Sequence, residues 1–232
     1  MKFISRIHVI ALVATISLSA ISCVKSGVES VETDENTTNS NTIDEQMNNR
    51  FYYWYKDQKI PLTQAGDKKY ILFESSNESV INDFLEKEKI KIISAPQDVK
   101  ISTIIPTIST PQFKNLRWMI IEYNSTQLKD IPSALYQTPF FETASKSEVG
   151  LSHLFYVKLK SSDDKNALMQ LAKENNIEVL GYNRFSPLWY TLQCTKFSKG
   201  NALGMANKFY ETTLFAYAQP DLMAAASGAS GN

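Results

Sequence analysis

The chain has few of the residues that form catalytic or metal sites. Its 232 residues include two cysteines, Cys23 and Cys194, and two histidines. If Cys23 carries a lipid, as argued below, Cys194 has no partner left for a disulfide or for a cysteine-rich zinc site. A Ser-His-Asp site needs a histidine to take the serine proton, and His153 is the one histidine outside the N-terminal segment, with no serine or aspartate at a telling spacing. We therefore expect no enzyme, no catalytic residue and no metal site, and interpret His153 as structural.

The chain also lacks net charge. Its 24 lysines and arginines balance 24 aspartates and glutamates, so it has no general attraction for nucleic acid. Neither a G-x-x-x-x-G-K-S/T phosphate loop nor a dinucleotide-binding glycine motif occurs in the sequence. We expect no cofactor and no nucleic-acid partner. With 43% hydrophobic and 11% aromatic residues, the chain can still build an ordinary globular core in one or two domains.

An apolar run at the N-terminus has the pattern of an export signal. Lys2 and Arg6 accompany the apolar residues 7–18, a stretch too short to span a bilayer as a mature anchor. The following Ala20-Ile21-Ser22-Cys23 resembles a bacterial lipobox. We expect acylation of Cys23 and a lipid anchor in the membrane of a bacterial cell envelope, at the outer membrane or the cell surface. The alternative is an ordinary signal peptide and a secreted protein.

The rest of the chain divides into four segments. Residues 24–49 are rich in Ser, Thr, Asn, Glu and Asp and are expected to form a disordered linker. Residues 50–152 and 153–223 have strand and helix periodicity, which predicts two α+β subdomains. The small residues of 224–232 are expected to form a flexible tail.

The periodicity of the second subdomain predicts the order strand, helix, strand, strand, helix, strand. One helix should follow the capping residues Ser161 to Asp163 and the other should follow residues 198–201, while Pro220 should end the last strand. This order is that of the split βαβ, or ferredoxin-like, fold. The expected strands are residues 154–160, 177–182, 188–194 and 214–218.

The first subdomain is expected to have a similar order, without any repeat at the level of residues. A hairpin is expected around Asp57-Gln58 and another around Lys146, and the proline-containing residues 95–113 should form a loop or an edge segment. Further strands are expected at residues 70–74, 91–94 and 116–123, and helices at 77–89 and 125–136.

The two helices of the second subdomain should cover one face of its sheet, which leaves an aromatic face on the other side. Apolar surfaces larger than about a few hundred Å² usually mark binding sites. We therefore expect this face to dock on a partner protein or on the other half of the chain. Counted by strict alternation, its residues are Tyr156, Leu180, Tyr182, Trp189, Thr191, Phe215 and Tyr217.

Three stretches within this subdomain carry a family resemblance. They are LFYVKLK at 154–160, GYNRFSPLWYTLQ at 181–193 and GNALGMANKFYETTLFAYAQPDLM at 200–223. In this order they resemble the N-terminal propeptide region of secreted subtilisin-like serine proteases. The match covers about the last third of the chain closely and residues 51–73 more loosely. The chain departs from the family after Met223, where AAASGASGN follows, and we therefore expect a protein without the catalytic domain.

The resemblance implies a non-catalytic, exported lipoprotein that binds a subtilisin-like serine protease as an inhibitor or a folding chaperone. The aromatic sheet face would pack on the protease surface, and the segment after the last strand would lie extended in the substrate cleft, like a bound peptide. That segment is Gln219, Pro220, Asp221, Leu222 and Met223.

Three other interpretations stay open. The chain could be the front end of a subtilisin-like protease that has become separated from its catalytic domain. It could also be a surface lipoprotein that uses the same face for an unrelated protein or a glycan. RNA-binding modules of the same topology stack bases on sheet aromatics, but export and neutrality argue against that function.

Overall fold

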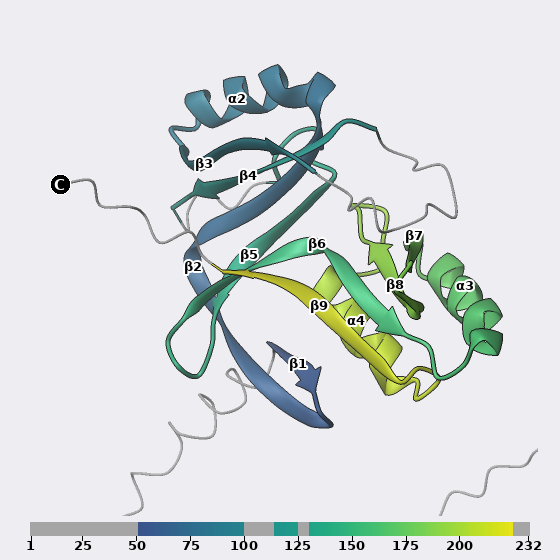
Figure 1. The fold of residues 1–232 in the computed structure, drawn as a ribbon. Helices are drawn as coiled ribbons and strands as arrows, with labels where there is room; N and C mark the ends of the chain where they lie inside the picture. Colours follow the sequence, from purple (N-terminus) through teal and green to yellow (C-terminus); the bar gives the residue numbers. More distant parts are fainter. Residues whose placement is uncertain (1–50, 100–113, 125–129, 225–232) are drawn as a thin grey trace, which may run out of the picture. The chain divides into compact units, whose positions relative to one another are not determined.

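The computed structural model describes residues 51–99, 114–124 and 130–224, all within one compact unit, Asn39–Asn232. Cys23, the expected linker and residues 225–232 of the expected tail lie outside the described residues. Figure 1 shows the elements in chain order. The strands are β1 (Phe51–Tyr55), β2 (Gln58–Glu74), β3 (Lys91–Asp98), β4 (Leu116–Glu122), β5 (Tyr136–Glu142), β6 (Glu148–Lys158), β7 (Glu178–Asn183), β8 (Ser186–Gln193) and β9 (Tyr217–Ala224). The helices are α2 (Glu78–Lys87), α3 (Lys165–Glu174) and α4 (Ala202–Glu211), with short 3-10 turns η1 (Ser75–Asn77) and η3 (Ser162–Asp164).

The nine strands of the described residues form one antiparallel sheet. Along the sheet the order is β3-β4-β2-β5-β6-β8-β7, while β1 pairs with β2 and β9 pairs with β6. Three α-helices accompany this sheet in the described part of the chain, so the protein is of the predicted α+β class. Strand β6 crosses residues 152 and 153, where we expected a subdomain boundary, and the sheet contains strands from both sides of it.

The described chain enters the sheet through a tight hairpin. Lys56 and Asp57 have φ angles of 47° and 62°, as the two central residues of a type I′ turn do. The turn therefore lies one residue earlier than expected. Strand β2 then continues for 17 residues and includes the strand that we expected separately at residues 70–74. A register shift between Ala65 and Lys69 allows both halves of β2 to pair with β5.

The helix expected at residues 125–136 is absent from the described part of that range. Residues 125–129 are not described, residues 130–135 form turns, and Tyr136 begins β5. Pro132 lacks the amide hydrogen that a helix interior requires, and Ser133 has a φ angle of 62°. In its described residues, the first half of the chain therefore does not repeat the order of the second half.

The second half runs β6, α3, β7, β8, α4 and β9 along the chain. Polar side chains fix where its two helices begin. Ser161 accepts a hydrogen bond from the amide of Asp163, and the carboxylate of Asp164 accepts one from the amide of Ser161. Asn201 caps α4 by accepting a hydrogen bond of 2.8 Å from the amide of Gly204.

The last strand begins and ends later than we expected. It covers Tyr217–Ala224, so Pro220 lies within the strand and does not end it. Pro220 stands opposite Phe155 of β6, next to a register shift. A proline is tolerated here because β6 is the one strand with which β9 pairs in the described sheet, so β9 does not need amide hydrogens on both sides.

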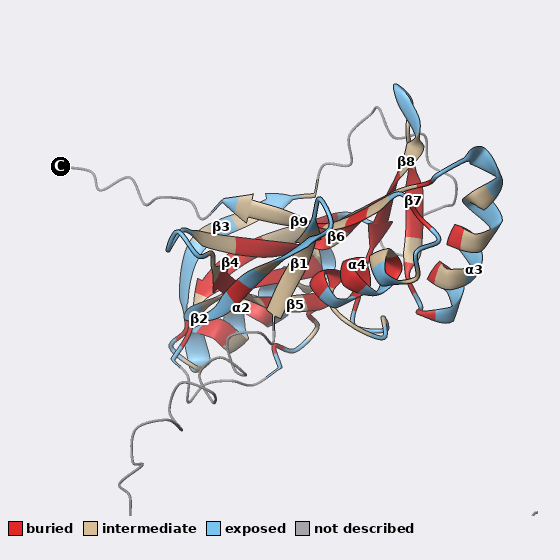
Figure 2. Cartoon of the chain, turned by 90° about the horizontal axis from the view of Figure 1, so that it is seen from below, coloured by how far each residue is buried: buried red, intermediate tan, exposed pale blue. Residues whose placement is uncertain are grey.

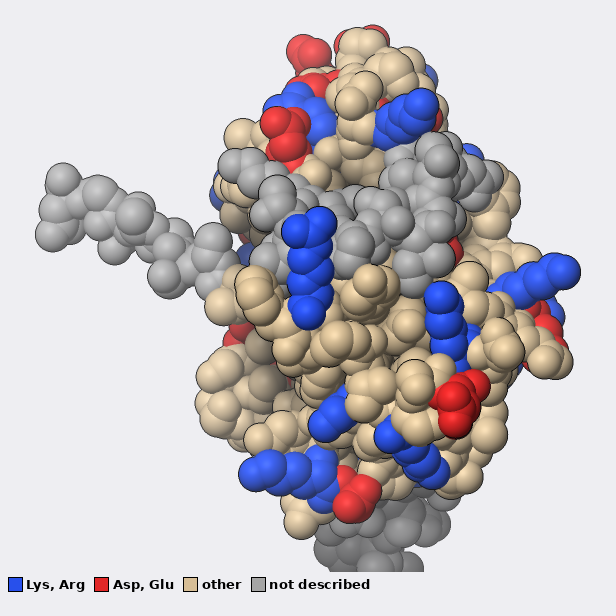
Figure 3. Space-filling model, turned by 45° about the vertical axis from the view of Figure 1, so that its right-hand side comes forward, with Lys and Arg blue, Asp and Glu red and all other residues tan. Residues whose placement is uncertain are grey.

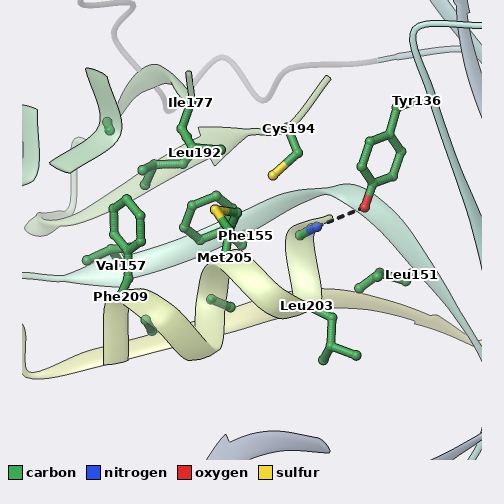
Figure 4. Packing of buried hydrophobic residues seen from close by; sticks show 14 of the residues in the cluster. Tyr136, Leu151, Phe155, Val157, Ile177, Leu192, Cys194, Leu203, Met205 and Phe209 are labelled. Atoms are coloured by element: carbon green, nitrogen blue, oxygen red, sulfur yellow. Dashed lines mark hydrogen bonds between the residues drawn. The ribbon is translucent and has the colours of Figure 1, made fainter. Parts of the chain in front are cut away.

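Different helices cover the two faces of the sheet. Along β2, Tyr70 and Leu72 belong to one hydrophobic core, whereas Ile71 and Phe73 belong to the other. Helix α2 packs on the smaller core, and α3 and α4 pack on the larger. Figure 2 shows that the buried residues follow the strands and the inner sides of the helices. Figure 4 shows part of the larger core, with Phe155, Val157 and Leu192 of the sheet beside Met205 and Phe209 of α4.

His153 lies in the interior. The residue is 2% exposed, and its Nδ1 atom is 2.8 Å from the hydroxyl of Tyr70. Its Nε2 atom is also buried and has no hydrogen-bond partner among the described residues. Burial lowers the pKa of His153 from 6.5 to about 3. The imidazole is therefore neutral at pH 7, and its environment is that of a structural residue.

We predict that His153 makes the fold sensitive to acid. Between pH 6.5 and about 3 the unfolded chain binds a proton at His153 and the folded chain does not. The free energy of unfolding should therefore fall with falling pH, by about 1.4 kcal/mol for each pH unit in this range. Urea unfolding at pH 7 and pH 5 measures this slope, and His153→Gln should reduce it. Equal slopes for the variant and the wild type would contradict the prediction.

Candidate interaction surface

The candidate surface consists of side chains on β6, β8 and β9 that lie on the sheet face opposite the larger core. At the edge of the sheet, Tyr217 of β9 also reaches the end of α4. Val157 packs in the core on the side of α4, and successive strand residues point to opposite faces. Its neighbours Tyr156 and Lys158 therefore lie on the other face, where Lys158 stands opposite both Trp189 of β8 and Tyr217 of β9. We call these four residues, Tyr156, Lys158, Trp189 and Tyr217, the aromatic face.

The rings of the aromatic face contact one another and continue toward α4. The centres of the Trp189 and Tyr217 rings are 5.7 Å apart at 64°, and the Lys158 ammonium lies 5.9 Å from the Trp189 ring centre. Tyr217 also meets Tyr210 of α4 edge-on at 6.5 Å. Tyr210 in turn stacks on Trp54 of β1 at 5.1 Å. A row of half-buried aromatic rings thus connects β8 to β1.

Of the seven residues that we predicted for this face, the structure brings together Tyr156, Trp189 and Tyr217, and it places Thr191 opposite Tyr156. It places Tyr182 elsewhere, because a register shift in β7 sets it opposite Tyr190, whose ring belongs to the core on the helix side. Leu180 lies within the same shift and is 2% exposed.

Phe215 is also not on the aromatic face. It precedes β9, is 3% exposed and stacks on Phe209 of α4, with ring centres 5.8 Å apart. Counting residues by strict alternation fails at both places, because a bulge and a late strand start each move a side chain to the other face.

The segment that we expected to enter a protease cleft is part of the sheet. Gln219 pairs with Tyr156, and Leu222 and Met223 pair with the N-terminal half of β6. Pro220 is buried. In this structure residues 219–223 therefore occupy a strand position, and the backbone hydrogen bonds that a cleft would need are made to β6.

Asp221 fixes this segment to β6 through its side chain. Its carboxylate accepts hydrogen bonds from the hydroxyls of Ser152, at 2.7 Å, and Tyr156, at 3.2 Å. Burial raises the pKa of Tyr156 to about 12, and the nearby carboxylate of Asp221 contributes to the same shift. Tyr156 therefore remains a neutral hydrogen-bond donor at any physiological pH.

A second cluster, which the sequence did not reveal, joins β1 to α4. Glu211 accepts hydrogen bonds from the hydroxyl of Tyr52, at 2.6 Å, and from the indole of Trp54, at 3.0 Å. The side-chain amide of Asn207 donates to the carbonyl of Tyr52 at 2.6 Å. The hydrogen bond to Glu211 raises the pKa of Tyr52 to about 12 and lowers the pKa of Glu211. We call Tyr52, Trp54, Asn207 and Glu211 the β1 latch.

The described residues offer little for catalysis. The thiol of Cys194 is buried, and burial raises its pKa to about 12, so it is a poor nucleophile. Among the described residues, no group of three or more His, Cys, Asp or Glu side chains is placed to hold a metal ion. Within the same part of the chain, no helix is long and apolar enough to cross a membrane.

The loop before β5 and the loop before α4 border a surface cleft of about 440 Å³. Tyr136, Lys196 and Asn201 are among its lining residues. The cleft is separate from the aromatic face, because none of the four residues of that face lines it. Among its lining residues Tyr136 has a structural role, since its hydroxyl accepts a hydrogen bond from the amide of Ala202.

Comparison with known proteins places the chain in no family. No family model matches it, and no curated protein matches it. Among solved structures, the crystal structure of the acetolactate synthase small subunit from Thermotoga maritima is similar, with 10% sequence identity and a TM-score of 0.24. The alignment covers 68% of this chain and 96% of that one. A likeness this low supports no conclusion about function.

We predict that Asp221 holds the C-terminal strand in the sheet. In Asp221→Ala the buried hydroxyl of Ser152 loses its acceptor, and so does Tyr156. Hydrogen bonds to a charged acceptor contribute about 1.5–3 kcal/mol each when the acceptor is shielded from water. Asp221 is only half-buried, so water replaces part of both bonds, and the variant should lose roughly 1–3 kcal/mol of stability in urea unfolding. Asp221→Asn keeps one acceptor oxygen and should lose less. Equal stability of Asp221→Ala and the wild type would show that β9 is held by its backbone alone.

Proposed function

We propose that the protein is an exported, lipid-anchored and non-catalytic binding protein whose partner is a subtilisin-like serine protease. The sequence resemblance of residues 154–223 to the propeptides of such proteases motivates this proposal. The partner would dock on the aromatic face. The anchor would be Cys23, in the membrane of a bacterial cell envelope, and the alternative is a secreted protein without the lipid.

The arrangement of the second half supports a ferredoxin-like unit of the kind that the resemblance implies. Its strands lie in the spatial order β9-β6-β8-β7, and α3 and α4 pack on one side of them. The split βαβ order requires this neighbour relation, with the first strand between the third and the last. We therefore propose that residues 148–224 form the propeptide-like unit, within a larger sheet.

The observation that carries the proposal is the aromatic face itself. Trp189 and Tyr217 are half-buried, contact each other and lie beside Lys158 on the sheet face opposite the larger core. Tryptophan and tyrosine are enriched among the residues that contribute most to protein–protein binding, because they bury a large area and carry a polar group. A surface of this composition is better suited to binding a protein than to catalysing a reaction.

The strand position of residues 219–223 limits how such a protein could inhibit. For these residues to enter a substrate cleft, β9 would first have to separate from β6, and Asp221 would have to leave Ser152 and Tyr156. We therefore propose that the aromatic face binds the protease first, while β9 stays in the sheet. Binding through this face alone would suit a folding chaperone, and release of β9 into the cleft would add inhibition.

The aromatic face can be tested by binding. We expect the purified chain to bind at least one subtilisin-like protease from the same cell, and the double variant Trp189→Ala/Tyr217→Ala to bind at least about tenfold more weakly. Isothermal titration calorimetry against a panel of such proteases measures this. The matched control is Phe197→Ala, an exposed aromatic residue away from the face. If the wild type neither binds nor slows any protease of the panel, the proposal is wrong, and an unrelated protein or glycan partner is then the next to be tested.

The lipid anchor can be tested by counting thiols. Cys194 is buried and should not react with a thiol reagent in the native protein. After denaturation, protein purified from membranes should give one reactive thiol if Cys23 has been acylated. Two reactive thiols would contradict acylation, and mass spectrometry of the N-terminal peptide provides the control.

A further inference from the structure

The hairpin that joins β7 to β8 ends in an exposed aromatic side chain. Arg184 and Phe185 are its two turn residues, between the paired residues Asn183 and Ser186. Phe185 is 82% exposed, the highest value among the exposed large hydrophobic residues of the described chain. In Figure 2 the tip between β7 and β8 is exposed and extends beyond the buried part of the two strands. An isolated ring in this position adds nothing to the core.

The tip is held in a defined conformation. The side-chain oxygen of Asn183 accepts a hydrogen bond of 2.9 Å from the amide of Phe185, which is the geometry of an Asx turn. This bond fixes the backbone from which the Phe185 ring projects. A partner that binds the ring would therefore order little more than one side chain, and the entropy cost of binding would be small.

The tip lies at the same end of the sheet as the aromatic face. The amide of Leu159 donates to the carbonyl of Leu188 at 2.9 Å, so the start of β8 lies beside the end of β6. The ammonium of Lys160 donates to the carbonyl of Thr213, which brings the start of the last strand to the same end. Phe185 therefore lies four residues along the chain from Trp189 and beside the strand ends that carry the rest of the face.

This end of the sheet is positively charged. The three chain segments that meet here, residues 156–160, 181–189 and 214–219, contain Lys158, Lys160 and Arg184 and no aspartate or glutamate. Figure 3 shows lysine and arginine side chains spread over the face of the molecule that it presents, with aspartate and glutamate side chains among them. The nearest carboxylates along the chain whose contacts are known already accept hydrogen bonds within the protein. Asp221 accepts from Ser152 and Tyr156, Glu211 from Tyr52 and Trp54, Glu178 from Gln193, and Asp164 from the amide of Ser161. A partner with acidic groups around an apolar hollow would complement this end.

We propose that Phe185 is the anchor residue by which this protein binds its partner protein, inserting into an apolar pocket of the partner that is bordered by carboxylates. The proposal rests on the proposed function, since the partner is the protease that docks on the aromatic face. Phe185 fills the pocket, Arg184 and Lys158 meet the carboxylates, and Trp189 and Tyr217 cover the adjoining surface.

A folded protein fits this end of the sheet better than a membrane or a nucleic acid. Recognition of anionic lipid takes clusters of about four to eight basic residues, and nucleic-acid binding gains its strength from many phosphate contacts. Three cations are too few for either. One rigid aromatic residue with flanking charges is the usual composition of a hot spot between proteins, where a few central residues provide most of the binding energy.

The test compares three variants of the full-length chain by surface plasmon resonance on the immobilised protease. Phe185→Ala should weaken binding at least about tenfold, while its circular dichroism and melting temperature stay those of the wild type, because the ring is exposed. Phe197→Ala is the matched control, an exposed phenylalanine that follows the other end of β8, and should bind as the wild type does. Arg184→Glu should mainly slow association, and more so at low salt.

The outcomes separate this inference from the proposed function. If the wild type and Phe185→Ala bind the protease equally well, Phe185 is not the anchor, and the proposed function stands. If the wild type binds no protease, the proposed function fails and the inference fails with it. The fourth measurement uses vesicles of phosphatidylcholine and phosphatidylglycerol. Binding to these vesicles that depends on Phe185 would overturn the inference in favour of a membrane surface.

Discussion

The pairing of β6 on both of its sides is the constraint on which the rest of the structure depends. β6 pairs with β9 along one edge and with β5 and then β8 along the other. This position joins the two halves of the chain in one sheet. It also fixes which side chains of β6 face α4 and which face away, because a strand hydrogen-bonded on both sides cannot slip by one residue without moving its core residues to the other face. The aromatic face is therefore a consequence of where Val157 and Phe155 must be buried.

The same pairing creates a competition for the C-terminal strand. Residues 219–223 complete the sheet, and they would have to leave it if they were to lie in a partner's cleft. A partner that takes β9 must bind it more strongly than β6 does, including the hydrogen bonds of Asp221, and the balance between the two states is set by this difference in affinity. Docking on the aromatic face would leave β9 paired with β6, so the partner would not have to replace these hydrogen bonds. In the proposed function, the recognition of a partner is thus a separate step from any insertion into its active site.

Much of the fold could be predicted from periodicity, and the failures have physical causes. The α+β class, the helices and most strands follow from local patterns. Capping residues such as Ser161 and Asn201 also mark where helical turns begin. The candidate site was harder to predict from the sequence than the fold. Tyr182 was misplaced because a bulge in β7 breaks the alternation. Pro220 was taken as a strand end because its edge position depends on the assembled sheet. The β1 latch joins residues more than 150 positions apart, and no local pattern reports such contacts.

The β1 latch holds the first described strand to α4, which matters if Cys23 is acylated. The described chain begins at β1, which pairs with β2 on one side and is held to α4 by Asn207 and Glu211 on the other. Trp54 of the latch stacks on Tyr210, and Tyr210 meets Tyr217 of the aromatic face. If Cys23 is acylated, a pulling force from the membrane would act on β1 before the rest of the described fold. The contacts of β1 with α4 would resist this force. Strand β1 and the proposed docking surface belong to one packed unit, so a pull on β1 would act on the elements that carry the face.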